Sequence, residues 1–276
     1  MENYKLKDIQ DEMLSIAVHF DDLCRQHNLS YVICGGSLLG AVRHEGFIPW
    51  DDDFDVLMPR RDFNKFISIW EDSETLSTIK VGDDGYYKVG TPLKVFNKFT
   101  RVSEINELEN GMPEFNEYGI FLDVFPADFY PDTIFWKIIN RYFGKLIVTK
   151  EMSRFPMRKK SLIQRFIYKS TFLLPKSLIY KLKEKLILSL CNNDFEPSEL
   201  KVGYGLETPF NNLWLNIDCV FPAQKKFKIN GNFFYGPNKP NEYLEARYGD
   251  FTVLPPINMR YQHIVDVKYV GKKNEE

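Results

Sequence analysis

A run of acidic residues at positions 51–55 constrains this chain more than any other feature. It reads Asp-Asp-Asp-Phe-Asp and leads directly into the apolar residues Val-Leu-Met. Side chains alternate between the two sides of an extended strand, so a strand through this run places Asp51, Asp53 and Asp55 on one side and Asp52 on the other. Carboxylates this close together can all ionise near neutral pH only if a cation lies among them. The run therefore indicates a metal site and not a solvated surface turn.

A Gly-Gly-Ser turn precedes the acidic run. Gly35 and Gly36 follow a short apolar strand expected over 31–34, and Ser37 is expected to cap a helix that ends near Arg43. Such a turn brings backbone N–H groups and a hydroxyl close to an anion at a helix N-terminus. Mg²⁺ takes hard oxygen ligands and usually shares them with substrate phosphates. The turn and the acids together predict phosphate chemistry with Mg²⁺, with Mn²⁺ as the alternative metal.

A third part of the pattern is a single carboxylate inside an apolar segment. Asp123 lies within residues 119–125, which otherwise read as a buried strand. A carboxylate in such a strand is costly to bury unless it is paired or binds a metal. Asp123 is therefore expected to join the acids of residues 51–55 in one site.

Length and composition exclude several classes of protein. The 276 residues suffice for one large domain, or for one domain with an elaboration, and the net charge of −2 predicts no general affinity for nucleic acid. The N-terminus has no apolar leader, and no run of 18 or more residues is free of charge, so neither a signal peptide nor a membrane span is expected. The four cysteines form no C-x-x-C pair and are expected to be reduced core residues. These features predict a cytoplasmic protein.

Residues 133–190 differ from the rest of the chain in charge. They hold 14 basic and 2 acidic residues, a net charge of +12, which leaves −14 for the remainder. Apolar pairs recur every four residues from Ile134 to Ile147 beside a basic stripe, which predicts a basic amphipathic helix, and a second helix is expected over 178–190. The region is either an extra helical layer with a solvated basic face or a surface that lies on an anionic membrane. The second interpretation adds a peripheral location at the inner face of the plasma membrane.

Two long motifs carry a family resemblance. The sequences GGSLLGAVRHEGFIPWDDDFDV and FLDVFPAD resemble the LicD family of phosphocholine and related phosphodiester transferases, which are similar to the fukutin-related proteins. The resemblance continues at residues 220–222, 243–244 and 248–250. It implies an α+β fold, with a nucleotidyltransferase-like mixed sheet flanked by helices and a basic helical insert. The expected organisation is a catalytic core over 1–130, the insert over 131–192, and a C-terminal part over 193–276 that completes a single LicD-type domain.

The resemblance also assigns roles to the acids and the turn. It matches Gly36 and Ser37 to the donor-phosphate turn, and Asp123 to the third carboxylate. Spacing alone does not choose between Asp51/Asp53 and Asp53/Asp55 as the main metal pair. The resemblance favours the second pair, because Phe54 supplies the apolar residue between them. The expected metal ligands are Asp51, Asp53, Asp55 and Asp123, and the expected catalytic residues are Asp53, Asp55 and Asp123.

Cations and aromatic rings complete the expected site. Arg43, at the end of the motif helix, and Lys94, on a later strand, are expected to neutralise phosphate charge. A quaternary ammonium group needs aromatic faces around it, and Trp50 beside the acids is the first candidate. Further candidates are Tyr118, Phe121, Tyr204 and Trp214. The residues expected to bind substrate are Gly36, Ser37, Arg43, Trp50 and Lys94.

The resulting hypothesis is Mg²⁺-dependent transfer of phosphocholine from CDP-choline to a hydroxyl of a cell-surface glycan precursor. That acceptor is of the teichoic acid or lipopolysaccharide type, either free or held on a lipid carrier. Asp53 and Asp55 are expected to share the metal with the pyrophosphate, and Asp123 to receive or orient the hydroxyl proton. The closest alternative transfers glycerol phosphate or ribitol phosphate from its CDP-activated donor to a capsular or teichoic-type glycan. A nucleotidyltransferase that uses a nucleoside triphosphate and a catalytically inactive binding module are the remaining alternatives.

Overall fold

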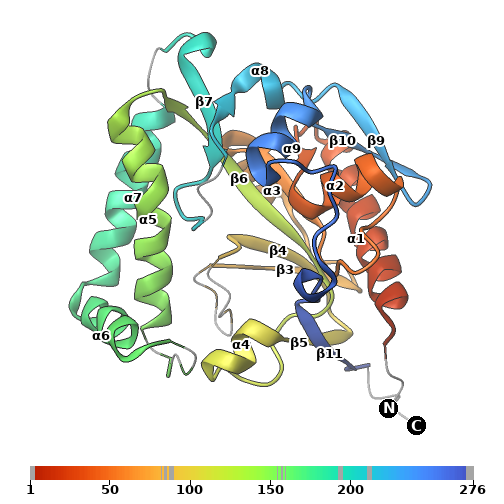
Figure 1. The fold of residues 1–276 in the computed structure, drawn as a ribbon, viewed down its shortest axis with the longest axis horizontal. Coiled ribbons are helices and arrows are strands. Elements are labelled where there is room, and N and C mark those ends of the chain that lie inside the picture. The colour runs from red at the N-terminus through yellow and green to blue at the C-terminus, as the bar shows by residue number, and fades with distance from the viewer. Residues whose placement is uncertain are drawn as a thin grey trace.

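The computed structural model describes residues 4–271 except 82, 84, 85, 87–89, 154, 157, 159, 192–194 and 210–212. A seven-stranded mixed sheet forms its centre (Figure 1). The strands follow the order β1-β2-β6-β4-β3, and β7 and β8 continue the sheet from β6. Their bounds are Val32–Ile33 (β1), Asp55–Pro59 (β2), Leu76–Lys80 (β3), Leu93–Asn97 (β4), Phe121–Pro131 (β6), Leu200–Tyr204 (β7) and Leu215–Asn216 (β8). The expected mixed sheet flanked by helices is confirmed.

The long central strand β6 organises the sheet. Its first half lies between β2, which runs parallel to it, and β4, which runs antiparallel, and its second half pairs with β7. The strand register places Asp55 opposite Asp123, and Asp123 opposite Lys94. Side chains directly opposite each other on neighbouring strands project from the same face of a sheet. Two carboxylates and one ammonium group therefore form a row across β2, β6 and β4.

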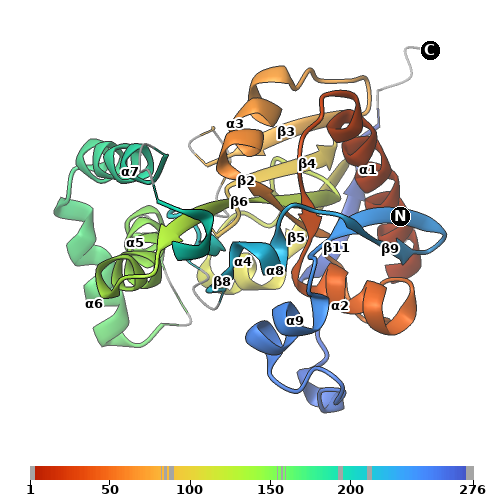
Figure 2. The same ribbon diagram turned by 90° about the horizontal axis from the view of Figure 1, so that it is seen from above.

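Helices cover the sheet where the apolar spacing predicts them. Helix α1 (Leu6–Gln26) buries residues at intervals of three and four, and it packs against β4 and β6. Helices α2 (Gly35–His44) and α3 (Arg60–Ile69) both contact β2. In Figure 2, α3 lies on one side of the sheet and α2 on the other, together with α8 (Ile217–Val220) and α9 (Pro240–Tyr248).

Two small antiparallel pairs complete the core. The aromatic segment 227–235 around Asn230-Gly231 predicts a hairpin, and strands β9 (Lys225–Ile229) and β10 (Asn232–Gly236) form it, with positive φ angles at Asn230 and Gly231. Strand β5 (Thr100–Glu104) pairs with β11 (Ile264–Tyr269) near the C-terminus. The polar and acidic composition of residues 103–117 predicts a loop, which is wrong for its first part, because β5 extends to Glu104 and helix α4 (Ile105–Asn110) follows directly.

The basic region folds into helices, as predicted. Helices α5 (Ile134–Met152), α6 (Leu162–Ser170) and α7 (Lys176–Cys191) lie beyond one end of the sheet, on the left in both views, with a short 3₁₀ turn at Thr171–Leu173 (Figures 1 and 2). A small apolar cluster separate from the main core joins α5 and α7 to the sheet, and it includes Trp136, Phe143 and Ile179 together with Tyr130 of β6. All three helices fall within 131–192, and the proposed division of the chain into core, insert and C-terminal part stays a prediction.

Several local predictions need correction. Strand β2 begins at Asp55 and not at Asp53, so the first three acids stand in an extended loop. Cys34 is the N-cap of α2, and Ser37 lies inside its first turn, so the predicted cap is wrong. Cys191 is exposed, although the other three cysteines are buried as expected. Among the described residues, none of the helices combines the length and apolar character that crossing a membrane requires.

Candidate active site

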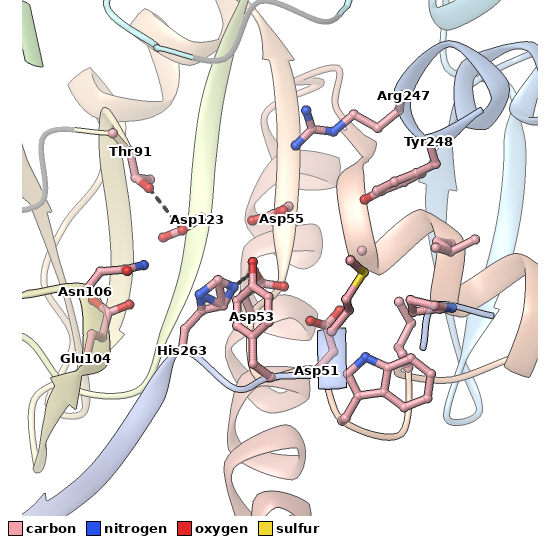
Figure 3. Close-up of a pocket in the computed structure, with 18 of the residues that line it drawn as sticks. Asp51, Asp53, Asp55, Thr91, Glu104, Asn106, Asp123, Arg247, Tyr248 and His263 are labelled. Atoms are coloured by element: carbon pink, nitrogen blue, oxygen red, sulfur yellow. Dashed lines mark hydrogen bonds and ion pairs between the residues drawn. The ribbon is translucent and has the colours of Figure 1, made fainter. Parts of the chain in front are cut away.

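A cavity of about 1060 Å³ lies where β2, β6, α2 and α9 meet (Figure 3). Its wall contains seven of the predicted site residues: Gly36, Arg43, Trp50, Asp51, Asp53, Asp55 and Asp123. Ser37 and Lys94, the other two, do not belong to the wall. The structure thus brings together parts of the chain that are separated by more than two hundred residues in sequence, because α9 and the segment before β11 close the far side.

The acidic run divides as its alternation predicts. Asp51, Asp53 and Asp55 face the cavity, whereas Asp52 is 1% exposed and points away from it. The Asp52 carboxylate accepts the backbone N–H groups of His263 and Ile264 at 2.9 and 2.6 Å. Asp52 therefore anchors the C-terminal segment against the acidic loop, while its three acidic neighbours face the cavity.

Asp123 is held by two side chains. Its Oδ1 lies 2.5 Å from Nζ of Lys94, and its Oδ2 accepts a hydrogen bond of 3.1 Å from the Thr91 hydroxyl. Lys94 is fully buried, with its ammonium 3.1 Å from the centre of the Phe121 ring. Lys94 thus stands behind Asp123, and its direct contact with a substrate phosphate stays a prediction.

The two glycines allow the acids to approach α2 closely. A Cβ on Gly35 would stand 2.6 Å from Oδ2 of Asp55, and the φ angle of Gly35 is +54°. A Cβ on Gly36 would collide with Oδ2 of Asp51. The Ser37 hydroxyl accepts the backbone N–H of Asp55 at 2.8 Å, which ties the helix to the strand. The turn therefore positions the carboxylates, and the expected phosphate contact of Ser37 stays a prediction.

The acids of the cavity carry more negative charge than their surroundings compensate. Burial first, and then the charges of Asp53 and Asp123, raise the pKa of Asp55 well above its usual value. Burial and the charges of Asp53 and Asp55 likewise raise the pKa of Asp51. A cation among these groups would reverse this effect, because it favours the ionised carboxylates.

The donor set fits Mg²⁺ in its chemistry, since hard carboxylate oxygens face one cavity and a glycine cradle makes room for them. Within the described part of the chain, no three His, Cys, Asp or Glu side chains already have the close spacing of a formed metal cluster. The identity of the metal and of its ligands therefore remains a prediction.

Two basic residues of the site were missed from the sequence. Arg247 on α9 and His263 before β11 both line the cavity, and His263 lies beside Asp53 (Figure 3). The Nε2 atom of His263 lies 3.9 Å from Oδ2 of Asp53, and the positive charge of Arg247 partly offsets the raised pKa of Asp55. Arg247 immediately precedes the Tyr-Gly-Asp motif of the resemblance, a usable signal. His263 had none, because Asp52 places it through tertiary contacts.

The aromatic candidates separate into two groups. Trp50, Phe121 and Tyr204 line the cavity, and the guanidinium of Arg260 lies 4.5 Å from the Trp50 ring centre. Tyr118 is buried and donates a hydrogen bond of 2.6 Å to Glu104, and Trp214 stacks on Tyr130 outside the cavity wall. The other end of the cavity carries polar side chains that the sequence did not predict, because α4 was expected to be a loop. These residues are Glu104, Asn106, Glu107 and Asn110.

Comparison with known proteins agrees with a site built for phosphate chemistry. A profile of the family described as "LicD/FKTN/FKRP, nucleotidyltransferase domain" matches residues 28–168, about half of the chain and the part that carries the acids. The chain belongs to the LicD family. It is 27% identical to the lipopolysaccharide cholinephosphotransferase LicD of Haemophilus influenzae over 98% of this chain and 100% of that protein. Uncharacterized protein RP689 of Rickettsia prowazekii is 54% identical over 35 residues, 13% of each chain.

Proposed function

We propose that this protein transfers phosphocholine from CDP-choline to a hydroxyl of a cell-surface glycan precursor, of the lipopolysaccharide or teichoic acid type. The observation that carries this proposal is the meeting of Asp51, Asp53, Asp55 and Asp123 at one cavity beside the Gly35–Gly36 turn. Membership of the LicD family supports a phosphotransferase, and the near full-length relative supports the choline head group. Both the CDP donor and the acceptor are part of the proposal.

In this proposal Asp53 and Asp55 hold Mg²⁺, with Asp51 beside them and Asp123 as a further ligand. The bound ion would neutralise charge on the pyrophosphate and on the departing CMP. The chain itself contributes cations to the cavity wall, where Arg247 and Arg43 would contact phosphate oxygens. Electrostatic groups fixed in this way need no reorganisation when the phosphorus centre reacts.

Asp123 is the residue that we assign to the acceptor hydroxyl. Lys94 and Thr91 each bond one of its carboxylate oxygens, which fixes its orientation. A fixed carboxylate at the cavity wall can receive or orient the proton of an attacking hydroxyl. In this proposal Lys94 acts through Asp123 and not on the donor.

One observation favours an alternative donor. The polar side chains of α4 and Glu104 line one end of the cavity, and such groups suit the hydroxyls of an alditol better than a trimethylammonium group. The second candidate is therefore transfer of glycerol phosphate or ribitol phosphate from the corresponding CDP donor. Trp50 and Tyr204 at the cavity wall favour choline.

The test is CMP release from CDP-choline, CDP-glycerol and CDP-ribitol, each with a glycan acceptor and with Mg²⁺ or a chelator. We expect CDP-choline to be used, and Asp55→Asn to lower kcat about a thousandfold, as expected for a lost electrostatic contact in the transition state. Asp22→Asn is the control, because its side chain is 57% exposed on α1 and outside the cavity. Release of pyrophosphate from CTP in place of CMP, or full activity of Asp55→Asn, would contradict the proposal.

A further inference from the structure

Helix α6 has no buried residue, although one of its sides is strongly apolar. Leu162, Ile163, Phe166 and Ile167 are 81, 74, 74 and 52% exposed. Residues at these spacings share one side of a helix. A helix of nine residues is too short to be stable in water through its own propensity, so most of its stability must come from contacts of its apolar side. The described part of the chain supplies few such contacts, which indicates that another surface covers α6.

Further exposed apolar side chains lie on the neighbouring elements. On α5, Ile134, Phe135, Ile138 and Tyr142 are all more than half exposed. In the 3₁₀ turn, Phe172 and Leu173 are 65 and 86% exposed, and Leu178 and Leu188 of α7 extend the pattern. Single exposed apolar residues need no explanation, but a collection of this extent marks a contact surface. We call these residues of α5, α6, the 3₁₀ turn and α7 the insert surface.

The charge of this region limits the kind of partner surface that can cover the insert surface. Residues 133–190 carry +12, and exposed bases accompany the apolar side chains, for example Arg141 and Lys145 on α5, Lys169 on α6, and Lys181 and Lys185 on α7. A second copy of the chain docked through the same surface would bring two such charges together. A surface that is negative outside and apolar beneath complements both features. That description fits the interface of an anionic bilayer.

We propose that the insert surface docks on an anionic phospholipid bilayer, with the apolar side chains entering the headgroup boundary and the lysines and arginines at the lipid phosphates. The association is peripheral. The docking proposal is argued from the insert surface alone and does not depend on the proposed phosphotransfer.

The docked orientation has a consequence for the cavity, and this step does rest on the proposed function. Val148 and Met152 of α5, with Lys160 and Tyr168, form part of the cavity wall. On the other side of the cavity, Val253, Ile257 and Met259 are 65, 80 and 62% exposed. In Figure 2, α6 lies at the left of the molecule, and the dark blue segment that follows α9 lies at its lower edge. A bilayer that touches both would face the cavity between them, as an acceptor held on a membrane lipid requires.

The experiment measures co-flotation of the full chain with vesicles of phosphatidylcholine alone or mixed with phosphatidylglycerol. We expect binding to the mixed vesicles only, and weaker binding at high salt. The double variant Ile163→Ser/Phe166→Ser should lower the apparent affinity at least about tenfold, because two apolar side chains no longer enter the lipid. Phe233→Ser is the matched control, since Phe233 is 57% exposed on β10, outside the insert surface.

Each outcome is decisive for the docking. Absence of binding to mixed vesicles, or equal binding by the double variant and the control, would overturn it. Sedimentation velocity of the same proteins without lipid tests whether a second copy of the chain covers the insert surface instead. A wild-type dimer that dissociates in Ile163→Ser/Phe166→Ser would assign the surface to that second copy. CMP release with a soluble acceptor should be unchanged in the double variant, so a failure of the phosphotransfer proposal would be seen separately from a failure of docking.

Discussion

The central strand β6 carries two aspartates whose surroundings differ sharply. Asp123 faces the cavity together with three acids of residues 51–55, whereas Asp128 lies in a buried cluster with Arg60 and Glu207. Arg60 bonds Asp128 through Nε and Nη2, at 2.7 and 2.9 Å, and bonds Glu207 through Nη1 and Nη2, at 2.6 and 2.7 Å. One guanidinium thus makes two bidentate contacts and links α3, β6 and the chain after β7.

Charge compensation separates the two clusters. Burial alone would raise the pKa of Glu207, but the charge of Arg60 outweighs burial and lowers it to about 2. In the cavity, burial and neighbouring carboxylates act in the same direction and raise the pKa of Asp51 and Asp55. A cluster whose charges the chain itself balances contributes to the fold, whereas carboxylates that raise one another's pKa at a cavity are candidates for binding a ligand. The comparison therefore marks Asp128 and Glu207 as structural acids, whereas the functional role of the cavity acids stays a prediction.

The largest expected effect breaks the completed cluster. Arg60→Met leaves Asp128 and Glu207 buried without their shared cation, and we expect the free energy of unfolding to fall by about 3–5 kcal/mol. Urea denaturation followed by circular dichroism measures this change. Arg61→Met is the control, because the Arg61 side chain is 92% exposed, and it should stay within about 0.5 kcal/mol of the wild type. Equal losses in the two variants would remove the structural role of Arg60.

A smaller effect is expected beside the acidic cavity, where Lys94 and Asp123 form an ion pair. Lys94→Met should lower the unfolding free energy by about 2 kcal/mol, less than Arg60→Met, because Asp123 keeps the Thr91 hydroxyl and borders the cavity. Lys98→Met is the control. Lys98 directly follows β4, and its ammonium contacts the Ser73 carbonyl at 2.9 Å.

A double-mutant cycle sharpens this second prediction. The change Asp123→Asn made in the Lys94→Met background should cost less than the same change in the wild type, because the carboxylate there has already lost its cation. Strict additivity of the two changes, measured by the same denaturation, would show that the pair does not act as a unit.

The sequence predicted the acidic site through local rules. Alternation along an extended segment is a property of the backbone, so the division between Asp52 and its three neighbours could be foreseen. The Gly-Gly turn and the lone acid in an apolar strand were likewise visible, because an unpaired buried carboxylate is costly wherever it occurs. The charge and apolar periodicity of residues 133–190 are also local patterns, and they predicted α5 and α7.

The remaining parts depend on long-range register. Lys94 was expected at the site, but its partner follows from the pairing of β4 with β6, which local sequence does not encode. His263 is placed by the Asp52 carboxylate across more than two hundred residues. The residues of α4 were missed because a short polar segment resembles a loop until its neighbours pack on it. Tertiary contacts, and not propensity, therefore decide which cations and polar groups meet the acids.

The smallest expected effect tests the negative charge of the cavity acids, which their surroundings do not fully compensate. The pKa of Asp55 is higher in the folded chain than the value of about 4 expected when unfolded. Between those two values the folded protein binds the extra proton, so stability falls as pH rises through the window. With chelator present, Asp55→Asn should therefore raise the unfolding free energy by about 1 kcal/mol at pH 7, and by less near pH 4.

Glu207 should show the opposite slope, because its folded pKa of about 2 lies below the unfolded value. Its stabilisation is present above the unfolded pKa and is lost as pH falls toward 2.

Mg²⁺ should reverse the order of stability of the wild type and Asp55→Asn at pH 7, since an ion that binds only the folded wild type stabilises it. Asp22→Asn should show neither the gain in chelator nor the reversal. If Asp55→Asn were less stable than the wild type without metal, the acids of the cavity would belong with the Arg60 cluster as structural charges, and the contrast between the two ends of β6 would disappear.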